Sequence, residues 1–509
     1  MSQINVSNLT FYYDGSYDNI FEDVSFSIDT NWKLGFIGRN GRGKTTFLNL
    51  LLGKYEYRGS ISKSVVVDYF PYTVLEEWKE ENTINVMEHL QPEYELWKIC
   101  RELSLLQVDS EVLYRPFQTL SYGEQTKVLL ALLFSQDNHF LLIDEPTNHL
   151  DMQARELVKE YLNSKKGFIL VSHDRYFLDS CIDHVLVINR ANIAVEVGNF
   201  SSWWENKRRQ DEYELAENDR LKKDISRLEA SARLTSEWAD KVERSKIGFN
   251  PLVKEKFIDS RAYIGEKSRR MQQRRKNLEH RQQNAIEEKK LLLKNIETVD
   301  DLKLFPLDYH KERLLEAKDF AIYYDGRKIT KDLNFILNRG DRIVLKGGNG
   351  CGKSSVIKYI LGEGIQSSGE LIKAGGLKIS YVSQDTSHLK GSLTDYMKEH
   401  DMNESLFKAI LRKLDFERLQ FDKNIENFSG GQKKKVLLAT SLCAQAHLYI
   451  WDEPLNFVDI FSRMQLEQLI EEFQPTMLFV EHDKAFVEKI ATKIIDFDTI
   501  DEAMVNNFV

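Results

Sequence analysis

Two copies of one phosphate-loop motif constrain the fold of this chain more than any other feature of its sequence. GRNGRGKT (38–45) and GGNGCGKS (347–354) both match G-x-x-x-x-G-K-[ST], and both follow an apolar segment typical of a strand, KLGFI and RIVLK. A glycine-rich turn that merely joins a strand to a helix is the alternative interpretation of one such motif. Two complete motifs in one chain argue against it.

The spacing between equivalent residues predicts a tandem duplication. The separation is 309 positions for Lys44 and Lys353, 309 for His173 and His482, and 308 for Asp144 and Asp452. At 509 residues the chain is long enough for more than one core. We therefore expect an α/β protein with two P-loop domains in tandem.

The chemistry of the motif assigns both loops to nucleotide phosphates. Glycines let successive backbone N–H groups face phosphate oxygens, the lysine neutralises the β and γ phosphates, and the hydroxyls of Thr45 and Ser354 suit Mg²⁺. The predicted ATP-binding residues of the first loop are Gly38, Arg39, Asn40, Gly41, Arg42, Gly43, Lys44, Thr45 and Thr46. Those of the second loop are Gly347, Gly348, Asn349, Gly350, Cys351, Gly352, Lys353, Ser354 and Ser355.

Each half also contains an apolar strand that ends in two carboxylates, HFLLIDEP (139–146) and LYIWDEP (448–454). We expect Asp144 and Asp452 to hold Mg²⁺, and Glu145 and Glu453 to orient the attacking water. An acidic pair alone could equally be a solvated strand end. Beside a phosphate loop at matching spacing, the catalytic interpretation is favoured.

A third repeated segment, LSYGEQTK (120–127) and FSGGQKKK (428–435), predicts two helices that open with a serine and a glycine. Such a start presents backbone N–H donors outward, although in isolation these would be ordinary capped helices. The residues predicted to contact ATP are Ser121, Gly123 and Glu124 in the first segment and Ser429, Gly431 and Gln432 in the second.

Together with NHLD (148–151) and SHD (172–174), these motifs resemble a pair of ATP-binding-cassette (ABC) domains. The resemblance implies that the domains face head to tail and enclose two ATP molecules, each closed by the signature segment of the other domain. Site one would then join Lys44, Thr45, Asp144, Glu145 and His173 to Ser429 and Gly431. Site two would join Lys353, Ser354, Asp452, Glu453 and His482 to Ser121 and Gly123.

The resemblance assigns roles to further residues. His173 and His482 are similar to the family's γ-phosphate switch, although a lone histidine would sooner be a capping or core residue. Tyr13 and Tyr324 are similar to its adenine-stacking aromatic, although either could simply be a strand residue. Gln384 is similar to the glutamine that assists catalysis and ligates Mg²⁺.

The first half departs from the family pattern, because Tyr72 stands where the glutamine is expected and Tyr122 replaces a signature glycine. Neutral tyrosine is a poor Mg²⁺ ligand. We therefore expect unequal sites, with site one binding ATP well but hydrolysing it more slowly.

The segment between the domains differs from them in charge. Residues 203–295 contain 24 Lys and Arg against 17 Asp and Glu, in a chain of net charge -9. Apolar residues at spacings of three, four and seven predict an antiparallel helical hairpin, whose first helix of about 40 residues would span roughly 60 Å. We assign residues 1–203 to the first ABC domain, 204–300 to the hairpin, with a tip at about 246–266, and 301–509 to the second ABC domain.

Basic flanks around an apolar tip suit RNA, where cations contact phosphates and aromatics stack on bases, although a solvated charged face is the plainer interpretation. The predicted ribosome- or tRNA-binding residues are Lys246, Phe249, Leu252, Val253, Lys254, Lys256, Phe257, Lys267, Arg269, Arg270, Arg274 and Arg275.

Composition excludes other classes of protein. The chain is globular, and its four cysteines form no C-x-x-C pair that would indicate a zinc ribbon. The N-terminus lacks a signal-peptide layout, and the longest apolar runs are shorter than the roughly 20 residues of a membrane-spanning helix. We expect a cytoplasmic protein without a membrane domain.

Tandem cassettes joined by a charged hairpin resemble the ABC-F family of translation factors. The long tip, and a first cassette without space for an extra arm, resemble the antibiotic-resistance subgroup of the Lsa and Vga type. The resemblance implies a monomeric, ATP- and Mg²⁺-dependent ATPase that binds the exit site of the 70S ribosome. Its linker would reach the P-site tRNA and the 23S rRNA of the peptidyl transferase centre and counteract lincosamides, pleuromutilins and streptogramin A.

Three alternatives stay open. A housekeeping ABC-F factor with a reduced arm would look similar. An ATPase subunit of a membrane transporter is the rival from another class, but it would have little use for a basic hairpin. Repair and chromosome ATPases of the cassette type carry zinc insertions or place their coiled coil inside the cassette, and the sequence shows neither pattern.

Overall fold

The computed structural model describes residues 2–497 apart from 14–18, 137, 149, 190–191, 248–301, 415 and 417–419; Arg269 and Gln273 are described within the longest of these gaps. The chain divides into two units, one formed by Met1–Trp203 with Asp300–Val509 and the other by Trp204–Val299. The first unit contains both predicted P-loop domains, here called cassette one (2–203) and cassette two (302–497).

Cassette one is built on a sheet with the strand order β5-β6-β7-β3-β8-β9, in which β9 is antiparallel to β8 and the other pairs are parallel. Its central strands are continuous apolar runs because both faces of the sheet are covered. The strands are β3 (Lys33–Ile37), β5 (Val66–Phe70), β6 (His139–Asp144), β7 (Phe168–Val171), β8 (His184–Asn189) and β9 (Asn192–Val197).

A second, antiparallel sheet with the order β2-β1-β4 packs with α1 over a phenylalanine-rich core that includes Phe21, Phe36 and Phe47. Its strands are β1 (Gln3–Phe11), β2 (Phe21–Asp29) and β4 (Arg58–Lys63). The helices of cassette one are α1 (Lys44–Leu51), α2 (Thr83–Leu90), α3 (Leu96–Leu105), α4 (Tyr122–Phe134), α5 (Met152–Asn163) and α6 (Arg175–Cys181).

Cassette two repeats this plan with a parallel sheet in the order β16-β18-β19-β14-β20. These strands are β14 (Arg342–Lys346), β16 (Ile379–Val382), β18 (Leu448–Asp452), β19 (Met477–Val480) and β20 (Lys493–Asp496). Antiparallel pairs join β11 (Arg313–Tyr324) to β12 (Arg327–Lys328), β13 (Leu333–Asn338) and β15 (Gln366–Lys373), and β10 (Phe305–Pro306) pairs with β17 (Gln445–Ala446). The helices are α9 (Lys353–Leu361), α10 (Leu393–Glu399), α11 (Glu404–Lys413), α12 (Gly430–Cys443), α13 (Ile460–Phe473) and α14 (Lys484–Ile490).

The predicted fold class is confirmed, since two tandem α/β cassettes contain the two phosphate loops. The loops follow β3 and β14, and the acidic pairs lie at the ends of β6 and β18, so loops and carboxylates lie at the same edge of each parallel sheet.

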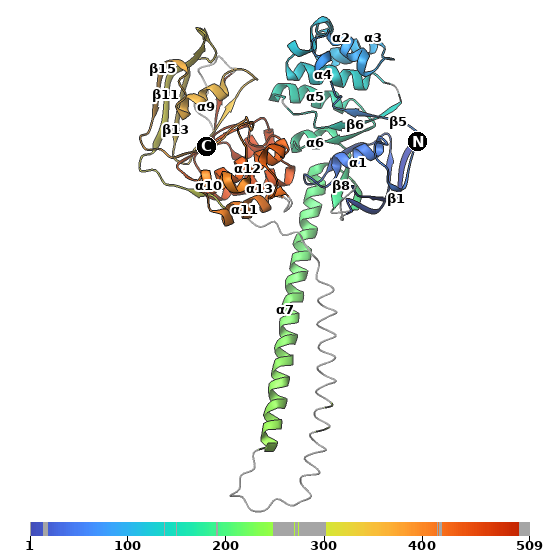
Figure 1. Cartoon of the computed structure of the whole chain (residues 1–509), viewed down its shortest axis with the longest axis vertical. Helices are drawn as coiled ribbons and strands as arrows, with labels where there is room; N and C mark the ends of the chain where they lie inside the picture. The colour runs from blue at the N-terminus through green and yellow to red at the C-terminus, as the bar shows by residue number, and fades with distance from the viewer. Residues whose placement is uncertain are drawn as a thin grey trace, which may run out of the picture. The chain divides into compact units, whose positions relative to one another are not determined.

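A single long helix, α7 (Phe200–Ile247), follows cassette one (Figure 1). Its 48 residues exceed the expected length, because the helix already begins inside the segment that the sequence assigned to cassette one. Phe200 and Trp203 at its base are buried, whereas much of the following turns is exposed and includes ion pairs such as Lys207 with Asp211. Apart from Arg269 and Gln273, which are helical, the predicted second helix lies outside the described residues, as does the tip beyond residue 247.

Candidate functional site

Both phosphate loops are shaped by a glycine in the left-handed region directly before the helix. Gly43 has φ 93° and Gly352 has φ 95°. A Cβ on Gly43 would come within 2.6 Å of Ile20, and one on Gly352 within 2.5 Å of Thr330. Glycine is therefore required at both positions, and the N-termini of α1 and α9 face the loops with their free N–H groups.

The loop lysines fold back over their own loops. Lys44 Nζ donates hydrogen bonds to the Gly38 carbonyl at 2.6 Å and the Arg39 carbonyl at 3.2 Å, and Lys353 Nζ donates to Gly347 and Gly348 at 2.7 Å each. Burial lowers the pKa of Lys44, although nearby Asp459 of cassette two opposes this effect. Each loop thus holds a buried ammonium group beside the space that a phosphate anion would occupy.

The acidic pairs have a shared and unusual backbone. Glu145 and Glu453 adopt left-handed φ values of 52° and 47°, which are uncommon for residues other than glycine. Their N–H groups donate to Val171 O at 2.8 Å and Val480 O at 3.0 Å. These hydrogen bonds to the neighbouring strand hold the turn, and the backbone bends away from the strand at each glutamate.

The oxygens around each acidic pair fit Mg²⁺. Thr45 Oγ1 donates to Asp144 Oδ2 at 3.3 Å, and Asp452 Oδ1 is buried without a hydrogen-bond partner among the described residues. Burial raises the pKa of Asp144 and raises that of Asp452 to about 6. No cluster of three or more His, Cys, Asp or Glu side chains suited to a metal occurs in the described part of the chain, so the ion would need nucleotide and water oxygens as well.

The two glutamates differ in their partners. Burial and the neighbouring Asp144 raise the pKa of Glu145 to about 8. Burial would also raise the pKa of Glu453, but His482 and Gln384 outweigh it and hold the pKa below its usual value. Gln384 Nε2 donates to Glu453 Oε2 at 2.8 Å, whereas the amide partner is replaced by Tyr72 in cassette one.

Tyr72 does not take over the role of that glutamine. Its hydroxyl accepts a hydrogen bond from Gln91 at 3.4 Å. Tyr69 on β5 instead donates to Asp144 Oδ2 at 3.1 Å, a contact that sequence reasoning missed. Tyr381 is its counterpart on β16 by strand register. The sequence signal for this contact was therefore the occurrence of a tyrosine at the matching position of each half.

The switch histidines lie beside the glutamates. His173 Nε2 is 3.4 Å from Glu145 Oε1, and His482 Nε2 is 3.7 Å from Glu453 Oε1. Burial, with Lys44 and Arg463 nearby, lowers the pKa of His173 well below its usual value. His173 is therefore neutral and can donate one ring hydrogen to an incoming anion.

Both signature segments form the predicted capped helices. Ser121 accepts a hydrogen bond from Glu124 N at 3.2 Å while Glu124 accepts one from Ser121 N at 2.8 Å, and Ser429 and Gln432 make the same pair at 3.3 and 3.0 Å. These capping boxes satisfy the serine and the third helical residue.

A cavity of about 460 Å³ joins phosphate loop one to signature segment two. The predicted site-one residues that line it are Asn40, Gly41, Gly43, Lys44, Thr45, Thr46, Asp144, Glu145, His173, Ser429, Gly431 and Gln432. Further lining residues that were not predicted are Asn148, Val171, Gln420, Gly430, Lys435 and Phe457. The structure therefore brings together residues from both cassettes that the sequence grouped into one site.

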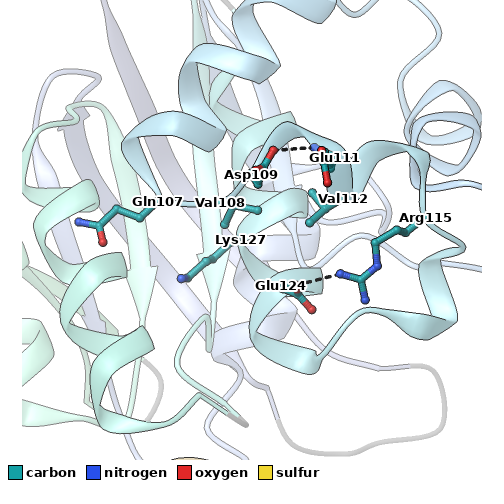
Figure 2. A pocket seen from close by; sticks show the side chains of 8 residues that line it. All are labelled: Gln107, Val108, Asp109, Glu111, Val112, Arg115, Glu124 and Lys127. Atoms are coloured by element: carbon teal, nitrogen blue, oxygen red, sulfur yellow. Dashed lines mark hydrogen bonds and ion pairs between the residues drawn. The ribbon is translucent and has the colours of Figure 1, made fainter.

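Ser121 and Gly123 line neither this cavity nor a smaller one of about 250 Å³ beside α4. Figure 2 shows the smaller cavity, in which Arg115 pairs with Glu124 at 3.3 Å and Lys127 projects from α4. The site-two contacts join residues of cassette two, since Gln384 and His482 both lie beside Glu453 at the end of β18.

The predicted adenine-stacking tyrosines are both accessible. Tyr13 is 41% exposed and shares a hydrogen bond of 2.8 Å with the Thr46 hydroxyl, which places it at phosphate loop one. Tyr324 is 45% exposed at the end of β11. Both rings could stack on a base.

Further contacts connect the cassettes. Arg155 pairs with Asp174 at 3.2 Å and donates to the His482 carbonyl at 3.2 Å, and Arg175 pairs with the buried Glu467. Switch regions and helices of both cassettes therefore meet through these contacts.

The base of α7 contacts cassette two beside site one. The Trp203 ring lies 6.4 Å from that of Phe461, and the Arg39 guanidinium lies 5.8 Å from the centroid of Phe461. Arg39 belongs to phosphate loop one, so one aromatic ring touches both the loop and the first turn of α7.

Nearly all of the predicted ribosome-contacting side chains lie outside the described part of the chain. Lys246 falls within the bounds of α7, where its side chain is not described, and Arg269 is helical and exposed. The remaining ten are Phe249, Leu252, Val253, Lys254, Lys256, Phe257, Lys267, Arg270, Arg274 and Arg275.

The chain matches the family model described as ABC transporter twice, over residues 21–148 and 330–456. The ribosome protection protein VmlR of Bacillus subtilis is 28% identical over 496 residues, covering 94% of this chain and 84% of the relative. The ATP-binding protein Uup of Buchnera aphidicola is 28% identical over 524 residues, covering 98% and 81%.

Among solved structures, an archaeal ABCE1 in a model of ribosome-bound Pelota and ABCE1 matches with a TM-score of 0.63 and 19% identity, covering 97% of this chain and 76% of that one. This similarity concerns the fold. Within the described residues, no helix is both long enough and apolar enough to span a bilayer.

Proposed function

This chain belongs to the ABC transporter family and is an ATPase, and we propose that it acts on the ribosome as a member of the ABC-F group. Two ATP molecules would bind between the cassettes and draw them together. Closure would make the helical linker competent to enter the ribosomal exit site, and hydrolysis would release it.

The observation that carries the nucleotide part of this proposal is the composite cavity. Lys44 and the N-terminus of α1 on one wall, and Ser429 and Gly431 on the other, supply cationic and N–H donors from two cassettes to one space. A polyphosphate between these walls would accept hydrogen bonds from both, so binding would favour the closed arrangement.

Within site one, each side chain has a chemical task. Lys44 and the loop N–H groups would bind phosphate oxygens, Glu145 would orient the attacking water, and His173 would donate to the γ-phosphate. Domains of this family typically bind Mg²⁺ with ATP, and Thr45 with Asp144 would hold it as a counter-charge to the phosphates.

Two observations support the ribosome as partner. Relatives over nearly the whole chain include a protein named for ribosome protection. The linker segment is also the basic part of an acidic chain, with 24 Lys and Arg against 17 Asp and Glu over residues 203–295. The predicted tip residues would approach P-site tRNA and 23S rRNA at the peptidyl transferase centre.

The finer function that we propose is protection against lincosamides, pleuromutilins and streptogramin A, with the linker tip counteracting the bound drug. A translation factor without drug protection is the second candidate. It is kept because Uup, a relative of equal identity, has a name that mentions only ATP binding, so similarity at this level does not select drug protection.

The testing experiment is co-sedimentation of the full chain with purified 70S ribosomes, with ATP and without nucleotide, at rising salt. We expect ATP-dependent binding that weakens steeply with salt, because the contacts to phosphates are electrostatic. Sedimentation that is independent of ATP, or absent at low salt, contradicts the proposal. A drug-susceptibility panel of an expressing bacterium then separates the two candidates.

A further inference from the structure

A lysine outside the predicted site is buried directly beneath the acidic pair of cassette two. Lys434 lies on α12, five residues after Ser429, and its exposed fraction is only 2%. Its Nζ donates three hydrogen bonds to backbone carbonyls: Ser383 O at 2.9 Å, Glu453 O at 3.0 Å and Asp452 O at 3.3 Å.

These acceptors belong to two separate segments of the cassette. Ser383 directly precedes Gln384, while Asp452 and Glu453 are the acidic pair at the end of β18. One ammonium therefore ties the backbone of the glutamine loop to the backbone of the carboxylates. Three donors on a single nitrogen suit this geometry, since an ammonium can serve three acceptors at once.

The tie lies beneath the contact that aims the glutamate. Gln384 Nε2 and Asn456 Nδ2 both donate to Glu453 Oε2, at 2.8 and 2.6 Å. Glu453 itself is held in a left-handed conformation with φ 47°. A shift of either segment would separate the amide of Gln384 from the carboxylate.

Burial of a lysine among carbonyls is costly, so an apolar residue would be expected at a position that only fills the core. Burial lowers the pKa of Lys434, and Glu481, Asp452 and Glu453 oppose that shift. The three backbone carbonyls satisfy the buried nitrogen by hydrogen bonds.

Cassette one has no such tie at the matching position. Thr126 corresponds to Lys434, because Ser121 corresponds to Ser429, and its hydroxyl donates to Tyr122 O at 2.9 Å within its own helix. The glutamine is also missing there, since Tyr72 takes its place. The lysine and the glutamine occur together in one cassette and are replaced together in the other.

We propose that Lys434 is a positioning residue for ATP hydrolysis at site two, where it holds the glutamine loop against the acidic pair so that Gln384 keeps Glu453 aimed at the attacking water. The inference rests on the roles proposed above for Gln384 and Glu453. It adds a residue that acts through both of them and does not touch the nucleotide.

The test measures turnover at each site separately, in a variant whose other site is inactivated. In Glu145→Gln, turnover reports on site two, and in Glu453→Gln it reports on site one. We expect Lys434→Met to lower kcat about tenfold or more in the first background with KM nearly unchanged, and to lower site-one turnover less than about threefold. Lys433→Met, which removes the neighbouring lysine, is the control for loss of charge.

A purely structural role would affect both sites, because α12 also carries Ser429 and Gly431 of site one. Equal losses in the two backgrounds, or no loss at site two, overturn the inference. Gln384→Ala is measured in parallel: if it loses turnover while Lys434→Met does not, the inference alone fails, and if neither loses turnover, the role of Gln384 fails with it.

Hydrogen exchange of the nucleotide-free protein supplies a readout that does not depend on turnover. We expect Lys434→Met to speed amide exchange in the glutamine loop, residues 383–387, without changing exchange around Tyr72. Unchanged exchange in residues 383–387 contradicts the tie.

Discussion

The side-chain amide of Asn40 donates a hydrogen bond of 3.1 Å to the carbonyl oxygen of Phe457. Asn40 belongs to phosphate loop one, and Phe457 follows the acidic pair of cassette two with a left-handed φ of 64°. The same carbonyl faces Gly431 of signature segment two. One backbone oxygen therefore links the two walls of site one.

This crowding predicts a strict requirement for glycine at position 431. A Cβ there would lie 2.6 Å from Phe457 O, so Gly431→Ala must displace backbone atoms. We expect a loss of about 1–3 kcal/mol in unfolding free energy, measured by denaturant titration of the nucleotide-free protein. Gly123→Ala is the matched control, since its nearest neighbour would be 3.8 Å away, and it should change stability little. Equal effects of the two substitutions would contradict the argument.

Unequal partners of the two glutamates predict unequal turnover. Glu453 is held by Gln384 and Asn456, whereas Glu145 stands beside Asp144 with its pKa raised to about 8 by burial. Glu453→Gln should therefore remove most of the steady-state ATP hydrolysis, and Glu145→Gln the smaller part. A phosphate-release assay of both variants checks this, and equal losses would show that the sites are equivalent.

The Phe461 ring predicts a coupling between nucleotide and linker. It touches Arg39 of phosphate loop one and Trp203 at the base of α7. We expect Phe461→Ala to weaken ATP-dependent ribosome binding about tenfold while turnover without ribosomes changes little, because a lost aromatic contact is worth about 1 kcal/mol or more. Phe473→Ala, on the same helix but packed on the cassette two core, is the control. Equal effects of both variants would remove Phe461 from the coupling.

The linker tip has a function that can be separated from nucleotide binding. Deleting residues 247–265 should spare ATP binding, because both cassettes belong to a unit that excludes this segment. The same deletion should abolish drug tolerance in a sensitive bacterium. Fluorescent-nucleotide titration and minimum inhibitory concentrations measure the two effects, and undiminished tolerance would contradict the role of the tip.

The motifs allowed much of this fold to be predicted, because their geometry is local. Strands KLGFI and RIVLK have the predicted bounds in the structure, and Ser121 and Ser429 cap their helices as expected. The 309-residue offset between Lys44 and Lys353 then extended each local result to the other half.

What the sequence could not give depends on side chains that meet across the fold. The hydroxyl of Tyr69 reaches Asp144 through the pairing of β5 with β6, and the carbonyls around Lys434 come from two loops that are distant in sequence. Tyr72 illustrates the same limit. The sequence shows that it replaces the expected glutamine, but not that its hydroxyl pairs with Gln91.

The central claim is that nucleotide-driven closure of the cassettes places the linker in the ribosome. The most direct measurement is ribosome co-sedimentation of the Glu145→Gln, Glu453→Gln double variant in excess ATP, followed by dilution. We expect a complex that persists long after the wild type has dissociated, because neither site can hydrolyse its ATP. Dissociation of the double variant as fast as the wild type would contradict the account.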